Sequence, residues 1–320
     1  MSHLTREQRY TICTMLQSGY PQCEIARVIN KDKSVVSREI RRNADARSGE
    51  YKDDLAHRKY LKHQAYKAKA RTFTPEVEAY VRDKLRLKYS PEQIAGVAKT
   101  NGDNCVSHER IYQFIWQDKR KKGTLYLDLR NRGRRYKKRS VIYDKRGTIP
   151  NRTDISLIPP EVELRERFGD LEIDLIIGKN HKGAILTIND RATGFGKLRK
   201  LDGKDAQQLA TATIDCLMEW KPLLKTITSD NGKEFAAHEL VAKHLNIDFF
   251  FAKPYASWQR GSNENYNRLV RQYIPKKVDF DCIPADYINF VEYQLNNRPR
   301  KRFKYESPMF MFNQKVAFST

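Results

Sequence analysis

The order of apolar runs between residues 168 and 275 constrains the fold more than any other feature of this sequence. Three β-rich runs come first, at 171–178, 184–190 and 194–201, and turn residues separate them. The pattern then predicts a helix at 205–220, a short strand at 225–229, a helix at 236–244, a strand at 247–252 and a helix from about 261. Strands grouped first and then alternating with helices indicate a mixed α/β sheet.

Three carboxylates stand at defined places in this pattern. Asp174 lies in the middle of the first strand, Asp230 lies just beyond the fourth, and Glu264 lies in the first turn of the last helix. The order of elements matches a ribonuclease-H-like fold, in which the first and fourth strands are neighbours and the last helix packs beside them. We therefore expect the three side chains to converge.

Converging carboxylates repel one another and favour protonation unless a cation joins them. Two Mg²⁺ ions about 3.5–4 Å apart would relieve the repulsion, with Mn²⁺ as a substitute, because hard cations prefer oxygen ligands. One ion would activate a water or 3′-hydroxyl, and the other would stabilise the leaving oxygen at phosphorus.

Each carboxylate also has a purely structural explanation. Asp230 stands in S-D-N-G, which is turn chemistry, and Glu264 complements the dipole at a helix N-terminus. Asp174 is the hardest to explain in this way, because it interrupts an apolar strand, where an unpaired carboxylate is costly.

The net charge of +22 indicates a polyanionic partner. Composition alone fits an RNA-coating protein as well as a DNA-binding protein. Residues 1–150 hold 35 Lys and Arg against 17 Asp and Glu, whereas residues 151–320 hold 26 against 22. The basic excess therefore lies in the first half, which suits a DNA-gripping front and a nearly neutral catalytic back.

The first 43 residues predict three short helices with a tight turn before the third, which is helix-turn-helix organisation. Thr5 and Gln8 form a capping-box pattern at the first helix. Val28 is expected to face inward on the second helix, and Ser34 to cap the third. A small helical bundle with a solvated basic face is the alternative to a DNA-reading module. The candidate DNA contacts on the third helix are Ser34, Ser37, Arg38, Arg41 and Arg42.

Residues 50–71 predict a basic helix, which is either a spacer with phosphate contacts or a solvated helix. The pattern of short capped helices then repeats loosely, with caps at Thr74, Ser90 and Ser107. A second helix-turn-helix would lengthen the DNA footprint, although small helical bundles share this pattern. Its candidate DNA contacts are His108, Arg110 and Gln113.

The segment 130–152 is basic and has few apolar residues, so it is not expected to fold on its own. It would order along phosphates or act as a solvated tether, and the two roles are compatible. Its candidate contacts are Arg134, Arg135, Lys137, Lys138 and Arg139. The predicted domains are a helix-turn-helix domain at 1–48, a basic helical spacer at 49–72, a second helix-turn-helix-like domain at 73–122, a basic linker at 123–160 and the ribonuclease-H-like domain at 161–320.

Basic and aromatic residues surround the expected site. Glu264, Arg268 and Arg271 share one helical face, so the two arginines would hold phosphates beside the metals. An aromatic ring in the preceding loop would stack on a displaced base, or Trp258 would serve as a packing anchor. The basic run 296–302 is a further candidate to track DNA. The DNA contacts expected from the loop are Tyr255, Trp258, Gln259 and Arg260.

Five strings of residues point to one family. They are E-I-D-L-I-I-G (172–178), T-S-D-N-G-K-E-F (228–235), P-Y-A-S-W-Q-R-G-S-N-E-N (254–265), R-Q-Y-I-P-K (271–276) and N-N-R-P-R-K (296–301). In this order, with 33 residues between Asp230 and Glu264, they resemble the DDE transposases of bacterial insertion sequences, specifically the insertion-sequence-thirty family. The front helix-turn-helix and I-P-N-R (149–152) are similar too, so the resemblance covers nearly the whole chain.

The resemblance implies that Asp174, Asp230 and Glu264 are the catalytic, metal-binding set. It also implies that the N-terminal domain binds the terminal inverted repeats and that the enzyme transfers strands into target DNA. Both DNA partners are double-stranded. Two DNA ends must be brought together, so it implies a homodimer or a higher oligomer.

Two other functions fit the same sequence: a DNA-binding regulator derived from a transposase, and a nuclease of the same fold that cuts without joining. No apolar run approaches the length of a membrane span, the N-terminus lacks the apolar stretch of a signal peptide, and the five cysteines lack zinc-ligand spacing. We expect a bacterial cytoplasmic protein, associated with the nucleoid when bound to DNA, with no membrane partner and no small-molecule substrate.

Overall fold

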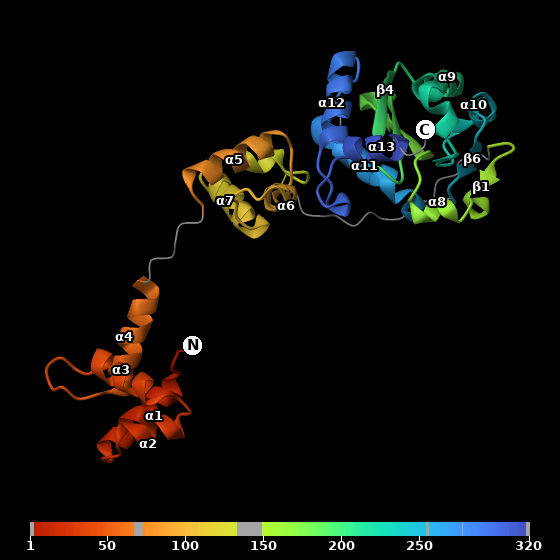
Figure 1. Cartoon of the computed structure of the whole chain (residues 1–320). Coiled ribbons are helices and arrows are strands. Elements are labelled where there is room, and N and C mark those ends of the chain that lie inside the picture. The colour runs from red at the N-terminus through yellow and green to blue at the C-terminus, as the bar shows by residue number, and fades with distance from the viewer. Residues whose placement is uncertain (1–2, 67–72, 133–148, 254–255, 277, 318–320) are drawn as a thin grey trace. The chain divides into compact units, whose positions relative to one another are not determined.

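The computed structural model describes residues 3–66, 73–132, 149–253, 256–276 and 278–317. The chain separates into two compact units, residues 1–71 and residues 72–320. Helices form the first unit and the start of the second, and a six-stranded sheet covered by helices forms the rest of the second (Figure 1). In the ranges described here, no helix is long and apolar enough to cross a membrane.

The first unit has a small helical core. Ile12, Ile25 and Val36 are fully buried in it. The capping box of Thr5 and Gln8 is confirmed. The helices are α1 (Arg6–Gln17), α2 (Gln22–Val28), α3 (Lys33–Asn43) and α4 (Asp53–Tyr66).

Two details of the first unit differ from the sequence prediction. Asp32, rather than Ser34, caps α3, because the Asp32 carboxylate accepts the Ser34 amide N–H at 2.8 Å. Val28 is 62% exposed instead of facing inward. It is the last residue of α2, and its neighbours Ile25 and Ile29 fill the core on their own.

The helix predicted as a spacer belongs to the first unit. α4 packs against α1, and Tyr51 and Ala56 are buried in the same core as Ile12. Glu39 Oε1 accepts a hydrogen bond from Arg9 Nε at 2.7 Å and one from the Tyr51 hydroxyl at 3.3 Å. This buried contact fastens the segment before α4 to α1 and α3, so at least the first half of the predicted spacer is part of the domain.

The second unit begins with three helices that are capped as predicted. The side chains of Thr74, Ser90 and Ser107 each accept an amide N–H at the start of their helix. Ile111 and Ile115 are fully buried. The helices are α5 (Pro75–Arg86), α6 (Pro91–Asn101), α7 (His108–Arg120) and the short 3₁₀ helix η1 (Leu125–Asp128).

The predicted linker is shorter than expected at both ends. Leu129, just after η1, is buried in the core of the α5–α7 domain. At the other end Ile149 and Ile155 are buried, and β1 (Thr153–Asp154) joins the sheet. The predicted contacts Arg134, Arg135, Lys137, Lys138 and Arg139 lie outside the described residues, so they remain predictions.

The sheet has the order β1-β6-β5-β2-β3-β4. β2, β3 and β4 form an antiparallel meander, and β5 and β6 run parallel to β2. This is the ribonuclease-H-like arrangement predicted from the sequence, with the first and fourth predicted strands side by side. The other strands are β2 (Asp170–Ile177), β3 (Ala184–Asp190), β4 (Gly196–Leu201), β5 (Thr226–Ser229) and β6 (Asp248–Phe251).

Helices cover both faces of the sheet. One core joins the sheet to α9 and α10, and the other joins it to α11 and α12. α13 was not predicted; it packs against α12, and the Phe312 ring on it stacks 4.5 Å from that of Phe195. The helices are α8 (Glu161–Leu164), α9 (Ala206–Leu217), α10 (His238–Leu245), α11 (Gly261–Tyr273), α12 (Ala285–Asn297) and α13 (Pro308–Ala317), and the short 3₁₀ helices are η2 (Ile155–Leu157), η3 (Lys179–His181), η4 (Met218–Leu223), η5 (Lys233–Phe235), η6 (Ser257–Arg260) and η7 (Lys301–Phe303).

The alternation of β2 decides which side chains face α11. Leu171, Ile173 and Leu175 belong to the core on the α9 and α10 side. Side chains alternate along a strand, so Glu172 and Asp174 point to the opposite face, where α11 packs. The strand therefore keeps its apolar residues on one side and presents two carboxylates on the other.

α11 lies close to the sheet because Gly196 has no side chain. A Cβ at Gly196 would lie 2.4 Å from the ring of Tyr266 on α11. Asn296 on α12 pairs with both backbone groups of Gly196, at 2.9 and 2.8 Å. Both α11 and α12 thus pack against the edge strand β4 at Gly196.

The packing of α4 leads to a test of the first domain. A fragment of residues 1–71 is expected to unfold cooperatively, whereas a fragment of residues 1–48 lacks Tyr51 and Ala56. Loss of these buried groups should cost about 2–5 kcal/mol of unfolding free energy. Thermal melting followed by circular dichroism compares the two fragments, and equal midpoints would show that α4 is only a spacer.

Candidate active site

Asp174 and Asp230 are brought together at the carboxyl end of β5. Asp174 lies within β2, and Asp230 directly follows β5, its parallel neighbour. The guanidinium of Arg260 lies between them, with Nη1 3.7 Å from Asp174 Oδ2 and Nη2 3.5 Å from Asp230 Oδ2. The arginine is only 13% exposed, so it places a positive charge where two carboxylates meet.

The Asp174 carboxylate is held in a fixed orientation. Oδ1 accepts a hydrogen bond from the Leu175 amide N–H at 2.9 Å, and Oδ2 accepts one from the Asn267 side-chain amide (Nδ2) at 2.9 Å. Burial raises its pKa to about 6, and the charge of Asp230 adds to this rise, while Arg260 acts against it. A carboxyl group with this pKa favours a cation beside it.

Glu264 lies on the same surface hollow as Asp174. The hollow has a volume of about 530 Å³, and Arg260 and Asn267 also line it. The Glu264 carboxylate forms an ion pair with Arg268, one turn further along α11. Within the described ranges, no three Asp, Glu, His or Cys side chains stand close enough together to hold a metal ion. Of the three carboxylates expected to converge, Asp174 and Asp230 form a pair across Arg260, and Glu264 lies on the same hollow as Asp174.

The other predicted contacts near the site have different surroundings. Gln259 Oε1 accepts the Lys253 amide N–H at 2.8 Å and so braces the loop before α11. Arg271, predicted to hold phosphate, is half-buried, and its Nη2 donates to Ile177 O at 3.0 Å. This hydrogen bond fastens α11 to β2, while Arg271 also lines the same hollow as Asp174 and Glu264, so its contact with phosphate stays a prediction. Tyr255 and the Trp258 side chain lie outside what the structure describes.

Two arginines of the basic run 296–302 take part in packing, while contact of this run with DNA stays a prediction. Arg298 is 3% exposed, and its Nη1 donates to Gln272 Oε1 at 2.8 Å. Arg300 Nη2 donates to Leu295 O at 2.9 Å. Burial lowers the pKa of Arg298 to about 10 and that of Arg300 to about 9. Arg298 thus connects the end of α12 to α11, and Arg300 bonds back to α12.

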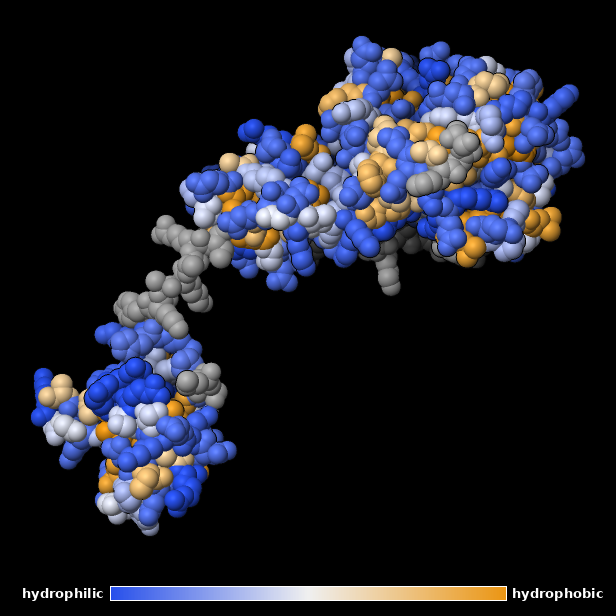
Figure 2. Space-filling view, viewed as in Figure 1, coloured by the Kyte–Doolittle hydropathy of each residue, from blue (hydrophilic) through white to orange (hydrophobic). Residues whose placement is uncertain are grey.

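The predicted reader helices present most of their candidate side chains. On α3, Ser34, Ser37, Arg38, Arg41 and Arg42 are all exposed. Arg38 bonds back to Ser34, with Nη2 3.0 Å from the hydroxyl. The visible surface of the first unit is mainly hydrophilic (Figure 2). On α7, His108 and Gln113 are exposed, whereas Arg110 is partly buried, with its guanidinium 5.0 Å from the Phe73 ring centroid.

Sequence reasoning missed several residues that build the site. Asn267 orients Asp174, and its position one turn after Asn263 in S-N-E-N-Y-N was the available signal. Arg152 Nη1 donates to Asn231 Oδ1, which connects the I-P-N-R segment to the loop holding Asp230. Glu172 is fully buried beside the site, and its spacing of two residues from Asp174 could have drawn attention to it.

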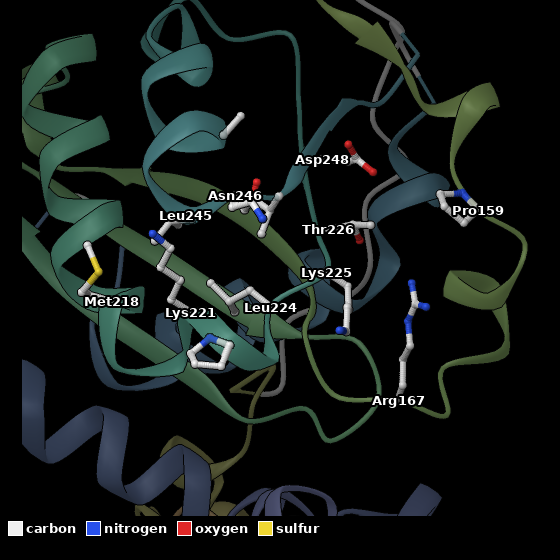
Figure 3. Close-up of a pocket in the computed structure, with 13 residues that line it drawn as sticks. Pro159, Arg167, Met218, Lys221, Leu224, Lys225, Thr226, Leu245, Asn246 and Asp248 are labelled. Atoms are coloured by element: carbon white, nitrogen blue, oxygen red, sulfur yellow. The ribbon is translucent and has the colours of Figure 1, made fainter. Parts of the chain in front are cut away.

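A separate hollow of about 850 Å³ lies at the opposite ends of β5 and β6 (Figure 3). Arg167, Lys221 and Lys225 line it with Thr226 and Asp248. Thr226 begins β5, whereas Asp230 follows its last residue. None of the predicted site residues lines this hollow, so the size of a depression does not identify the site.

Comparisons with known proteins agree with these observations. A family model described as a helix-turn-helix domain matches residues 1–43. The chain is 52% identical over 323 residues to the transposase for insertion sequence element IS4351 of Bacteroides fragilis, covering 99% of each chain. It is 30% identical to the transposase InsI for insertion sequence element IS30C of Escherichia coli, over 100% of this chain and 85% of the relative. The catalytic core domain of BIV integrase covers 47% of this chain and 97% of its own, with 19% identity and a TM-score of 0.39.

The surroundings of Asp174 predict a pH-dependent effect on stability. Its pKa in the folded protein is about 6, above the ordinary 3.8, so folding favours the protonated form. The ionised form therefore destabilises the protein above pH 6, by up to about 3 kcal/mol, and the effect vanishes below pH 4. In EDTA, Asp174→Asn should raise the melting temperature at pH 8 and leave it unchanged at pH 4. An equal change at both pH values would contradict this.

Proposed function

Because the chain belongs to the IS30 family of insertion-sequence transposases, we propose that Asp174, Asp230 and Glu264 form its metal-binding catalytic site. The protein is a DNA-binding polynucleotidyl transferase of the DDE type. The observation that carries the assignment of residues is the pairing of Asp174 and Asp230 across Arg260, with Glu264 on the same hollow as Asp174.

The donor set fits divalent metal ions. All three side chains offer only carboxylate oxygens, the ligands that Mg²⁺ and Mn²⁺ prefer. Arg260 already occupies the region between the two aspartates as a cation, and its Nε is buried with no hydrogen-bond partner among the described residues. A site that gathers negative charge around a cation in this way suits Mg²⁺, and we propose two ions, with Mn²⁺ able to substitute.

Each residue has a defined part in strand cleavage and transfer. Asp174 and Asp230 would hold ions at the end of the sheet, and Glu264 would reach them from α11. Bound ions would activate the attacking hydroxyl and neutralise charge at the phosphate. Arg268 is 59% exposed beside Glu264 and would neutralise a neighbouring DNA phosphate. Arg260 would release the aspartates and turn to the backbone of the bound strand.

DNA recognition is proposed for the helical part of the chain. The exposed arginines of α3 would contact the terminal inverted repeats, and the exposed end of α7 would extend the footprint. The net charge of the chain supports this, because electrostatic attraction to phosphate supplies much of the affinity for DNA. Two ends must be joined in one reaction, so we propose that the protein acts as a homodimer or higher oligomer.

The catalytic assignment is tested by strand transfer of a labelled inverted-repeat end into a plasmid with Mg²⁺. Asp230→Asn and Glu264→Gln should each lower joining at least about a hundredfold, because a charged ligand is lost, while end binding stays unchanged. Activity surviving in both variants would reject the assignment. Cleavage without joined product in the wild type would instead indicate a nuclease.

The reader helix is tested by binding of a labelled inverted-repeat end at fixed salt concentration. Arg38→Ala and Arg41→Ala should each weaken binding on the order of tenfold, since each removes a contact to a base or phosphate. Lys62→Ala on α4, also exposed, is the matched control and should change binding little. If all three variants bind equally well, α3 is not the reader.

A further inference from the structure

Glu172 is fully buried beside the proposed site. It lies two residues before Asp174 on β2 and faces α11. Its Oε2 accepts the backbone N–H of Asn263 at 2.8 Å. Asn263 is in the first turn of α11, directly before Glu264.

The start of α11 lacks a cap of its own. Arg260 occupies the N-cap position, and its side chain makes no capping hydrogen bond. The first amide groups of a helix have no partner within the helix and carry partial positive charge. The carboxylate of Glu172, on β2, supplies the hydrogen-bond acceptor that the side chain of the N-cap residue usually provides.

A second contact one turn along fixes the register of α11 on β2. Asn267 donates to Asp174 Oδ2 at 2.9 Å. Residues two apart on a strand are separated by about 6.8 Å, and residues four apart on a helix rise by about 6 Å. The pairs Glu172–Asn263 and Asp174–Asn267 therefore match in spacing, and they set how far along β2 the intervening Glu264 lies.

Further buried groups hold Glu172 itself. Arg191 is 1% exposed, and its Nε lies 3.4 Å from Glu172 Oε1. Arg191 Nη2 also pairs with Glu163 at 2.9 Å. From β3, the Thr187 hydroxyl lies 3.4 Å from Asn263 Oδ1 and 3.2 Å from the Asp174 carbonyl oxygen. The junction between α11 and the sheet is thus polar and buried, and its contacts reach β2 and β3.

We infer that Glu172 is a positioning residue of the transposase. By capping α11 from β2, it places Glu264 level with Asp174 along the strand, where both carboxylates can bind one metal cluster. This rests on the proposed catalytic assignment. Glu172 does not touch DNA or metal in this role; it acts only through the amide of Asn263. Groups that orient metal ligands typically change metal affinity or activity about 10- to 100-fold when they are lost.

The test compares Glu172→Ala, which removes the acceptor, with Glu172→Gln, which keeps an oxygen acceptor. Glu292→Ala is the matched control, because Glu292 on α12 also accepts a backbone amide N–H, but from Leu198 on β4, at 2.6 Å, instead of from a residue of α11. The measurements on the full chain are melting temperature, Mn²⁺ affinity from free-ion electron paramagnetic resonance without DNA, end binding, and the single-turnover joining rate.

Glu172→Ala should weaken Mn²⁺ binding and slow joining, each about 10- to 100-fold, with end binding within twofold of wild type. Glu172→Gln should recover most of both losses. Glu292→Ala should lower the melting temperature and leave Mn²⁺ affinity and joining near wild type. Wild-type Mn²⁺ affinity and joining in Glu172→Ala, or equal losses in Glu172→Ala and Glu292→Ala, would overturn the inference.

Two additions keep the test decisive. If Glu172→Ala does not fold, Thr187→Val weakens the same junction and should shift Mn²⁺ affinity in the same direction by a few-fold; an unchanged affinity counts against the inference. Asp230→Asn tests the catalytic assignment separately. If Asp230→Asn keeps Mn²⁺ binding and joining, the assigned site is wrong; if it loses both while Glu172→Ala keeps them, only the role of Glu172 is wrong.

Discussion

A carboxylate inside a buried strand needs a positive charge beside it, and the proposed catalytic end of this domain is built around that need. Asp174 stands in β2 next to Asp230, and Arg260 lies between them. Burial and the second aspartate both raise the pKa of Asp174. The same electrostatic repulsion that raises this pKa would favour the binding of a divalent ion at the proposed site.

The position of α11 depends on that end of the sheet. Gly196 lets Tyr266 approach β4, and the paired contacts of Glu172 and Asp174 fix the helix lengthwise on β2. A carboxylate on a helix can join two on strands only if the helix cannot slide. Buried polar contacts suit this purpose, because a hydrogen bond forms only within a narrow range of distances and angles.

Local patterns in the sequence were enough to predict β2 to β6, most helix caps and the pairing of Asp174 with Asp230, but not the short strand β1. Long-range partners were not predictable in this way. The run 296–302 is basic, but Arg298 is buried because Gln272, on another helix, meets it. Arg271 likewise bonds to a carbonyl of β2. The sequence shows that a segment is basic. Whether one of its arginines is buried depends on which group from a distant part of the chain supplies a hydrogen-bond acceptor. The cap of α3 was misplaced by two residues because Asp32 and Ser34 are both good capping residues.

The account rests on one claim, that Asp174, Asp230 and Glu264 hold the same metal cluster. The most direct measurement is anomalous X-ray scattering from Mn²⁺ in crystals of the protein bound to an inverted-repeat end. The account predicts Mn²⁺ peaks contacted by Asp174 and Asp230, with Glu264 coordinating in the same cluster and Arg260 turned away. Peaks bound by other side chains, or a cluster that leaves Glu264 paired with Arg268, would contradict it.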